Sequence, residues 1–295
     1  MAFIPDVIRK CSENVRKLWE LADSCMLCPR KCKVHRSRGQ VGYCGIEITP
    51  KVSSIGPHFG EESVLVGAGG SGTIFFAGCN LACVFCQNYD ISHQRKGRKM
   101  STEQLAQSIL DLQNYGCSNI NFVTPTHVIH AIAAAIELAR KQGLILPTVY
   151  NSGGYDSVET LKLLDGLIDI YMPDMKYAGP KAAGELSDAK DYPQVNFAAV
   201  KEMYRQVGDL KTEKGLAARG LLVRHLVLPE NLAGSCEIID FLAKEISPKT
   251  TINVMSQYRP CYKASYYLKI NRHPSSEEIS AAKQYAINKG LNVLE

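Results

Sequence analysis

The sequence predicts an α/β fold: a partial barrel of about six parallel strand–helix units, preceded by an N-terminal extension rich in cysteine. Three observations predict it. Short apolar runs alternate with stretches of helical periodicity from residue 72 onward. Polar residues follow each apolar run, at the end where parallel strands gather functional side chains. Cysteines cluster before the first of these runs and directly after it.

The N-terminal extension begins with a predicted helix over residues 6–22, whose apolar residues recur largely on one stripe. A cysteine-rich segment follows. Cys25 and Cys28 are separated by two residues, which lets both sulfur atoms point at one metal ion. Cys32 and Cys44 can complete a shell of four thiolates around a structural zinc ion or an additional iron–sulfur cluster, and the spacing does not decide between these two. The alternatives are that only the first pair binds metal, or that none of the four does.

The segment 51–70 connects the extension to the barrel. It is rich in Gly and Ser and contains short β-like pieces such as residues 63–66. The acidic pair Glu61 and Glu62 is interpreted as part of a surface loop. The alternative is a role near an active site, because this segment leads directly into the first strand of the barrel.

The elements of the barrel alternate along the rest of the chain. Predicted strands span residues 72–77, 118–123, 147–151, 167–173, 220–228 and 250–256. Predicted helices span residues 102–114, 127–142, 157–165, 195–207, 235–246 and 276–289. Ser101 and Ser275 each stand three residues before a Gln or Glu, which predicts a capping box at two of these helices. We therefore divide the chain into 1–70, a helix plus a cysteine-rich metal-binding segment, and 71–295, the barrel.

A loop with three thiols follows the first strand. Cys79, Cys83 and Cys86 stand at spacings of four and three. Thiolates are the ligands that iron–sulfur clusters use. Three of them can hold three irons of a four-iron cluster, and no further cysteine follows in residues 87–94 to close the fourth iron. That iron would then be open to a ligand that is not protein. The alternatives are a zinc knuckle and three unrelated buried thiols.

Polar side chains stand at the ends of the other predicted strands. Thr126 and Asp156 among them can instead cap helices. Asp174 and Lys176 can instead form an exposed ion pair, which would contribute little, and His225 can be a hydrogen-bonded core histidine. The coincidence of polar residues at every strand end favours a site over these separate explanations. The full set is Thr124, Thr126, His127, Asn151, Ser152, Asp156, Asp174, Lys176, Arg224, His225, Gln257 and Arg259.

Length and composition are ordinary for a globular protein. The chain has 295 residues, of which 45% are hydrophobic and 21% charged, with a net charge of +5. The basic run 93–99 is interpreted as a solvated loop rather than a nucleic-acid patch. The N-terminus lacks the pattern of a signal peptide, and no apolar run approaches a membrane span. We expect a cytoplasmic, reducing setting without a membrane, where clustered cysteines bind metal rather than form disulfides.

These motifs resemble those of the radical S-adenosylmethionine (radical SAM) superfamily. Beyond the superfamily, the chain resembles the pyruvate formate-lyase-activating-enzyme-like branch that has an N-terminal Leu-Cys-Pro-Arg-x-Cys segment. The resemblance runs over most of the chain and implies a partial (β/α)6 radical SAM barrel, in line with the predicted strands. The residues that carry it are 28–32, 72–80, 86–88, 150–155, 171–177 and 223–229.

The resemblance implies cofactors and their contacts. In this superfamily three cysteines hold a 4Fe-4S cluster, whose open iron binds the amino nitrogen and carboxylate of S-adenosyl-L-methionine (SAM), and the reduced cluster cleaves SAM to methionine and a 5′-deoxyadenosyl radical. The matching ligands here are Cys79, Cys83 and Cys86. An Asp-x-Lys segment, a polar segment after the third strand and a strand arginine lie beside SAM in activating enzymes. A Gly-Gly-Glu motif is absent here, and two threonines at its place are expected to supply oxygens instead. The SAM contacts implied are Thr124, Thr126, Asn151, Ser152, Asp174, Lys176 and Arg224.

The resemblance also implies partners. A flavodoxin or ferredoxin would deliver the electron, and the first candidate substrate is a backbone glycine of a glycyl-radical enzyme. A small metabolite or another peptide is the second. The non-enzyme alternative is a zinc-ribbon nucleic-acid module built on the N-terminal cysteines, against which the single weak basic run argues. The remaining cysteines are interpreted mainly as buried thiols: Cys11, Cys117, Cys236 and Cys261.

Overall fold

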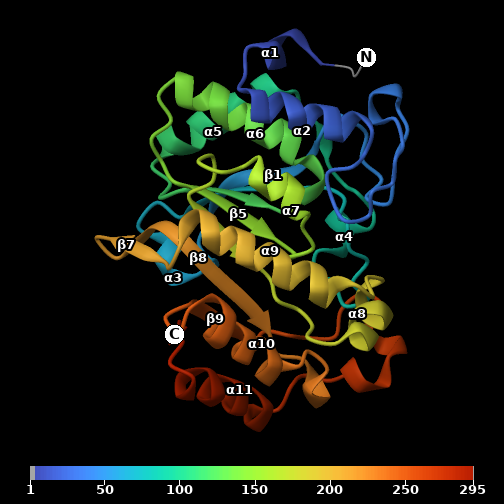
Figure 1. Cartoon of the computed structure of the whole chain (residues 1–295), viewed down its shortest axis with the longest axis vertical. Helices are drawn as coiled ribbons and strands as arrows, with labels where there is room; N and C mark the ends of the chain where they lie inside the picture. The colour runs from blue at the N-terminus through green and yellow to red at the C-terminus, as the bar shows by residue number, and fades with distance from the viewer. Residues whose placement is uncertain (1–3, 295) are drawn as a thin grey trace.

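A computed structural model describes residues 4–294. Its centre is a sheet of parallel strands whose spatial order follows the chain, each joined to the next by a helical crossover (Figure 1). This is the predicted α/β barrel architecture, open at its two edges. The parallel strands are β2 (Ser71–Phe76), β4 (Ile120–Val123), β5 (Thr148–Ser152), β6 (Ile170–Pro173), β8 (Leu216–Leu226) and β9 (Thr251–Met255).

Short strands extend the sheet beyond these six. β1 (Lys51–His58) pairs antiparallel with β2, and β3 (Arg98–Lys99) pairs antiparallel with β1. β10 (Asn292–Val293) lies parallel to β9 at the other edge, and β7 (Lys211–Glu213) forms a hairpin with β8. Strand β1 was not among the predicted strands. It runs antiparallel along β2 from Phe76 to Ser71, so that β1 ends at the amino end of β2 and the turn after His58 enters the cavity beside Arg224.

The helices cover the outside of the sheet. Ser101 and Ser275 form the predicted capping boxes at α5 and α11. In Figure 1, α2, α5 and α6 lie together on one side of the sheet, and α9, α10 and α11 lie toward the other end of the molecule. The helices are α1 (Asp6–Arg9), α2 (Glu13–Asp23), α3 (Ser63–Val66), α4 (Tyr89–Ser92), α5 (Thr102–Tyr115), α6 (Ile129–Lys141), α7 (Val158–Lys162), α8 (Pro180–Ser187), α9 (Tyr192–Val207), α10 (Ser235–Phe241) and α11 (Ser276–Asn288).

The N-terminal extension shares one hydrophobic core with the barrel. Helix α2 packs on α6, whose run of buried alanines lets a neighbouring helix approach closely. The Trp19 indole meets the His130 imidazole edge to face, with ring centroids 4.8 Å apart. Buried residues of both parts belong to a single apolar cluster. The division of the chain at residue 70 stays a prediction.

Three predictions about local structure are wrong, and one helix was missed. The helix over 6–22 is broken, because Ser12 accepts a hydrogen bond from the Val15 amide and caps a new helix there. Residues 63–66 are helix α3 rather than a β-like piece. Cys236 on α10 is exposed, whereas the sequence predicts a buried thiol. Helix α8, which begins at Pro180, was not predicted.

Within residues 4–294, no helix has both the length and the apolar character needed to cross a membrane.

Candidate active site at the carboxyl ends of the strands

The three-thiol loop follows β2 directly and lines a cavity of about 270 Å³ at the carboxyl ends of the strands. Gly78 starts the loop with φ +81°, a left-handed conformation that suits glycine. A Cβ at this position would stand 2.7 Å from the Cys44 carbonyl oxygen, so the glycine lets the N-terminal extension approach the loop. Cys79, Cys83 and Cys86 all face the cavity.

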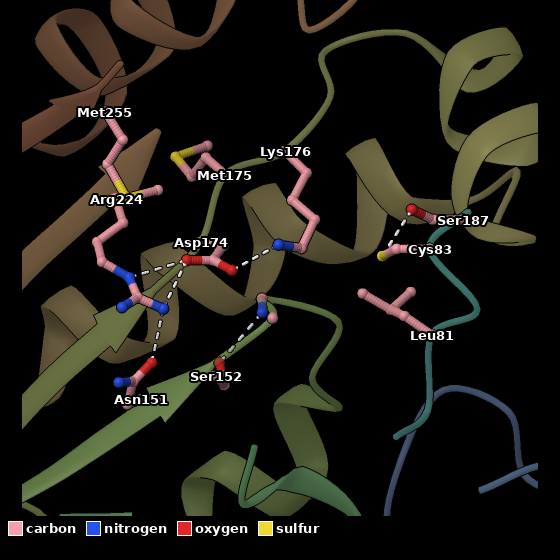
Figure 2. A network of polar contacts seen from close by, with 12 residues as sticks. Leu81, Cys83, Asn151, Ser152, Asp174, Met175, Lys176, Ser187, Arg224 and Met255 are labelled. Carbon is pink, nitrogen blue, oxygen red and sulfur yellow. Dashed lines mark hydrogen bonds and ion pairs between the residues drawn. The ribbon is translucent and has the colours of Figure 1, made fainter. Parts of the chain in front are cut away.

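Each thiol has one polar neighbour in the protein. The Leu81 amide donates to Cys79 Sγ at 3.4 Å, and the Ser187 hydroxyl donates to Cys83 Sγ at 3.0 Å. Figure 2 draws the second contact, with Leu81 beside it. The Ser92 hydroxyl lies 3.1 Å from Cys86 Sγ. These groups orient the sulfur atoms but supply too little charge to hold three thiolates without a metal.

Burial decides the charge of the thiols. Loss of solvation raises the pKa of Cys79 and of Cys83, although the nearby Lys176 ammonium lowers both. A thiol in such surroundings is neutral by itself, whereas coordination to a metal deprotonates it outright. Three such thiols on one loop are therefore a donor set suited to a metal cluster.

The thiol geometry bears on which metal fits. In the part of the chain that the structure describes, no group of three or more His, Cys, Asp or Glu side chains could hold a single metal ion as it stands. A zinc knuckle needs its ligands around one ion. A four-iron cluster takes one thiolate at each iron, so its ligands stand apart around an inorganic core. The three thiols are the type of ligand that such a cluster uses.

A charged wall faces the thiols across the cavity. Asp174, just after β6, lies between Lys176 and Arg224 (Figure 2). Its carboxylate accepts from Lys176 Nζ at 2.5 Å and from Arg224 Nε at 2.9 Å. Arg224 Nη2 also donates to the Asn151 side-chain oxygen at 2.7 Å, which links β5, β6 and β8 in one network. The ion pair is buried, so the interpretation as an exposed surface pair is wrong.

These side chains stay ionised. Burial alone would raise the pKa of Asp174, but Arg224 and Lys176 outweigh it, so the pKa is lowered. Burial likewise opposes the charge of Lys176, but Asp174 outweighs it, so the pKa of Lys176 is raised. A buried, fixed arrangement of charges can orient a zwitterionic ligand without reorganising when the ligand arrives.

A second polar network lies behind the cavity wall. Asp156 accepts hydrogen bonds from the hydroxyls of Thr126, Tyr150 and Ser152, each at 2.7 Å. Ser152 in turn accepts from the Gly154 amide at 3.1 Å. Asp156 is therefore not a helix cap. Thr126 belongs to this network and does not line the cavity, whereas Ser152 belongs to the network and also faces the cavity.

Four further residues predicted at strand ends can be compared with the structure. Thr124 lines the cavity and has φ +60°, a strained conformation of the kind that clusters at functional sites. His225 is a satisfied core histidine, because its two ring nitrogens lie 2.8 Å from the Met175 carbonyl and 2.8 Å from the Ser235 hydroxyl. Gln257 lines the cavity, while Arg259 is exposed.

The structure adds Glu61 as a candidate functional residue, although the sequence favours a surface loop at this position. Glu61 is buried, with 8% of its side chain exposed, and its carboxylate lies 3.8 Å from Arg224 Nη1. The interpretation as a surface loop is wrong for this residue, because the turn after β1 carries it into the cavity beside Arg224 on β8. The signal was present in the position of the acidic pair just before the first barrel strand.

The N-terminal cysteines form a second group beside the first. Cys25, Cys28, Cys32 and Cys44 line one small cavity of about 10 Å³. Burial raises the pKa of Cys25 to about 11 and that of Cys28 to about 12. These thiols would therefore also need a metal to be deprotonated.

Arg30 joins the two thiol groups. Its guanidinium lies over the Tyr43 ring, 3.8 Å from the centroid, and Nε donates to the Asn80 carbonyl at 3.0 Å. Asn80 follows Cys79 directly in the chain and lines the cavity of the N-terminal thiols. The three-thiol loop and the N-terminal thiols are thus adjacent in the fold.

Comparison with known proteins gives a family and a fold. The model of the radical SAM superfamily matches residues 73–233. The uncharacterized protein MJ0674 of Methanocaldococcus jannaschii is 34% identical over 281 residues, covering 92% of this chain and 76% of the relative. The uncharacterized protein MJ0808 of the same organism is 25% identical over 296 residues, covering 90% and 78%.

A solved structure shares the fold. The crystal structure of HydG, a maturase of the FeFe-hydrogenase, matches with a TM-score of 0.53 and 15% sequence identity, over 75% of this chain. The match spans 50% of the HydG chain. At this level of identity the likeness concerns the fold alone.

Proposed function

The chain belongs to the radical SAM superfamily, and from this premise we propose that its three-thiol loop holds a 4Fe-4S cluster that cleaves SAM to start a hydrogen-atom abstraction. The observation that carries the proposal is the placement of Cys79, Cys83 and Cys86 on a cavity whose opposite wall is charged. With three thiolates supplied, one iron is left facing that cavity. We assign the cluster ligands to these three residues.

The opposite wall supplies the contacts for SAM in this proposal. SAM carries an ammonium, a carboxylate and a sulfonium, so it needs groups of both signs. Asp174 and Lys176 offer a carboxylate and an ammonium held 2.5 Å apart, and Arg224 adds a second cation. Asn151, Ser152 and Thr124 offer neutral hydrogen-bonding groups at the same cavity. Thr126 contributes indirectly, through the hydrogen bonds that fix Asp156 and Ser152.

The bound cofactors supply the chemistry: one electron from a flavodoxin- or ferredoxin-type reductant divides SAM into methionine and a 5′-deoxyadenosyl radical, which takes a hydrogen atom from the substrate. The protein's own contribution is orientation and exclusion of water. Leu81 and Phe85 are buried beside the thiols and keep water away from them. Fixed charges on the facing wall hold the ligand in one pose.

We propose a place in the pyruvate formate-lyase-activating-enzyme-like branch, with a polypeptide segment as the substrate. A second cavity of about 1080 Å³ opens beside the first and shares residues with it, including Asn151 and Arg224. Such an open chamber suits a chain segment of a partner, such as the glycine loop of a glycyl-radical enzyme. A small metabolite would be served by a more enclosed pocket.

We also propose that the N-terminal thiols hold a second metal centre. Four cysteines line one small cavity that has no room for a substrate, and four thiolates are enough to complete the ligand shell of a metal. An auxiliary iron–sulfur cluster is favoured over zinc because Asn80, the residue after Cys79, lines the cavity of the N-terminal thiols, and this nearness suits electron transfer to the first cluster. Iron and zinc counts on purified, reconstituted protein distinguish the two.

The experiment for the main proposal is anaerobic reconstitution with iron and sulfide, reduction in the presence of SAM, and measurement of 5′-deoxyadenosine. We expect steady formation by the unchanged protein and none above background by Cys83→Ala. Cys236→Ala is the matched control, because this thiol is exposed and lies on α10 away from both cavities. Equal product from Cys83→Ala and the control would reject the assignment.

A further inference from the structure

Two carboxylates line the outer chamber without a cation of their own. Glu61 and Glu62 lie between β1 and α3, at the wall of the 1080 Å³ cavity. Glu62 Oε1 accepts from the Asn253 amide at 3.1 Å. Glu62 Oε2 is buried and has no hydrogen-bond partner among the described residues. A buried carboxylate oxygen left unpaired costs free energy, which a ligand that binds there would recover.

The cation beside the pair, Arg224, is already engaged. Arg224 lies 3.8 Å from Glu61, a distance too long for a hydrogen bond. Its guanidinium donates instead to Asp174 at 2.9 Å and to Asn151 at 2.7 Å. One guanidinium therefore serves three carboxylates, of which Asp174 takes the short contacts.

The protonation of Glu61 reflects this shortage of positive charge. Its burial, together with Glu62 and Asp174, raises the pKa of Glu61 to about 7, although Arg224 lowers it. An organic cation placed between the two carboxylates would supply the missing charge. A metal ion is a poorer fit, because no third acidic or histidine side chain joins the pair among residues 4–294.

The position of the pair connects it to the proposed chemistry. The outer chamber shares six lining residues with the thiol cavity: Phe75, Asn88, Val123, Asn151, Arg224 and Gln257. A substrate group bound at the pair would therefore extend toward the cavity where SAM is proposed to bind. The ring of Phe59, 60% exposed at the rim of the chamber, offers apolar surface for the stem of a long side chain.

We propose that Glu61 and Glu62 form a subsite for a guanidinium or ammonium group of the substrate. The proposal deepens the proposed function, on which it rests, by giving the substrate a positive charge. Two adjacent carboxylates, one of which has a buried oxygen without a partner among the described residues, match the donors of a guanidinium, which binds carboxylates in pairs. The same chemistry can come from an arginine or lysine side chain of a peptide or from a free amine.

The test is a binding measurement on reconstituted, SAM-loaded protein under anaerobic conditions. Calorimetry compares the tripeptide Gly-Arg-Gly with Gly-citrulline-Gly, which has the same shape without the charge. We expect the arginine peptide to bind at least tenfold more tightly, because hydrogen bonds between charged groups are stronger than those between neutral groups. Agmatine is the third ligand: binding as tight as that of the peptide assigns the subsite to free amines, and weaker binding assigns it to a peptide side chain.

Substitutions of the two glutamates test whether they cause the preference for the arginine peptide. Glu61→Gln with Glu62→Gln should abolish the preference for the charged peptide, and each single variant should reduce it. Glu245→Gln is the control, because this carboxylate pairs with Lys201 on the protein surface. Thermal unfolding checks that the variants fold. Equal affinity for the two peptides in the unchanged protein, or a preference that survives in the double variant, would overturn the subsite.

The outcome is separable from that of the proposed function. Cys83→Ala should lose SAM cleavage and keep the preference for the arginine peptide. A protein that prefers the charged peptide but never forms 5′-deoxyadenosine would reject only the radical chemistry. A protein that cleaves SAM but does not distinguish the peptides would reject only the subsite.

Discussion

The two cysteine groups of this protein differ in the space in front of their sulfur atoms. Cys79, Cys83 and Cys86 face a cavity of about 270 Å³ with a charged opposite wall. The four N-terminal thiols line a cavity of about 10 Å³. Both groups are desolvated, and in both the pKa of at least two thiols is raised. We propose that each group binds a metal, and the cavity volumes give only the first group room for a ligand beside that metal.

The difference has a physical basis in how each group is built. The first sits at the carboxyl end of β2, where the ends of neighbouring parallel strands supply polar side chains. The second lies on irregular chain between α2 and β1, packed against the barrel by Arg30 and Arg36. Three ligands at an open mouth are typical of a catalytic centre, and four in a closed shell are typical of a structural or relay centre.

The largest expected effect on SAM binding concerns the charged wall, formed by Asp174, Lys176 and Arg224. Asp174→Asn replaces the carboxylate that holds Lys176 and Arg224 with a neutral amide. We expect the KM for SAM in 5′-deoxyadenosine formation to rise about 10- to 100-fold, because charge-assisted hydrogen bonds contribute about 1.5–3 kcal/mol each. Asp165→Asn is the control, since that carboxylate pairs with Arg205 near the surface. An unchanged KM in Asp174→Asn would contradict a role of the charged wall in SAM binding.

A smaller effect is expected at the closed group. Cys28→Ala removes one of four ligands from a buried shell, so the second metal should be lost. The free energy of unfolding should fall by about 1–3 kcal/mol, the range for loss of a buried structural contact. SAM cleavage driven by dithionite should fall by less than about threefold, because the open group remains intact. Abolished cleavage in this variant would contradict the division of roles between the two groups.

The smallest effect is a pH dependence of stability from Glu61. Burial raises its pKa from 4.5 to about 7, so the folded protein keeps a proton that the unfolded chain releases between these two values. The free energy of unfolding contributed by this group is therefore full below pH 4.5 and declines as the pH rises toward 7. Glu61→Gln should be less sensitive to pH than the unchanged protein across this window, by at most about 1.4 kcal/mol per pH unit. Parallel denaturant titrations measure the difference, and identical slopes would contradict it.

The sequence predicted the barrel and most of the cavity wall, because both depend on local patterns. The alternation of strand-like and helix-like hydrophobic patterns along the chain predicted the six parallel strands. Polar residues at their ends gave Asn151, Asp174 and Arg224, which the structure joins by hydrogen bonds. These residues meet because parallel strands in chain order bring their carboxyl ends together.

Other features depend on pairings between distant segments, which local patterns do not carry. Strand β1 pairs antiparallel with β2, and the turn after it places Glu61 3.8 Å from Arg224 on β8. Asp156 looked like a helix cap, but the fold surrounds it with the hydroxyls of Thr126 and Tyr150. Ser187 on α8 reaches Cys83 from more than a hundred residues away in the chain, so no spacing rule could find it.

The central claim is that the three-thiol group leaves one metal position open toward the charged wall. The most direct test is electron–nuclear double resonance of the reduced, reconstituted protein with SAM labelled by 15N at its amino group. The account predicts a hyperfine coupling between the label and the cluster, which disappears in Cys83→Ala. A fully assembled cluster whose spectrum does not respond to SAM, and shows no coupling to the label, would contradict it.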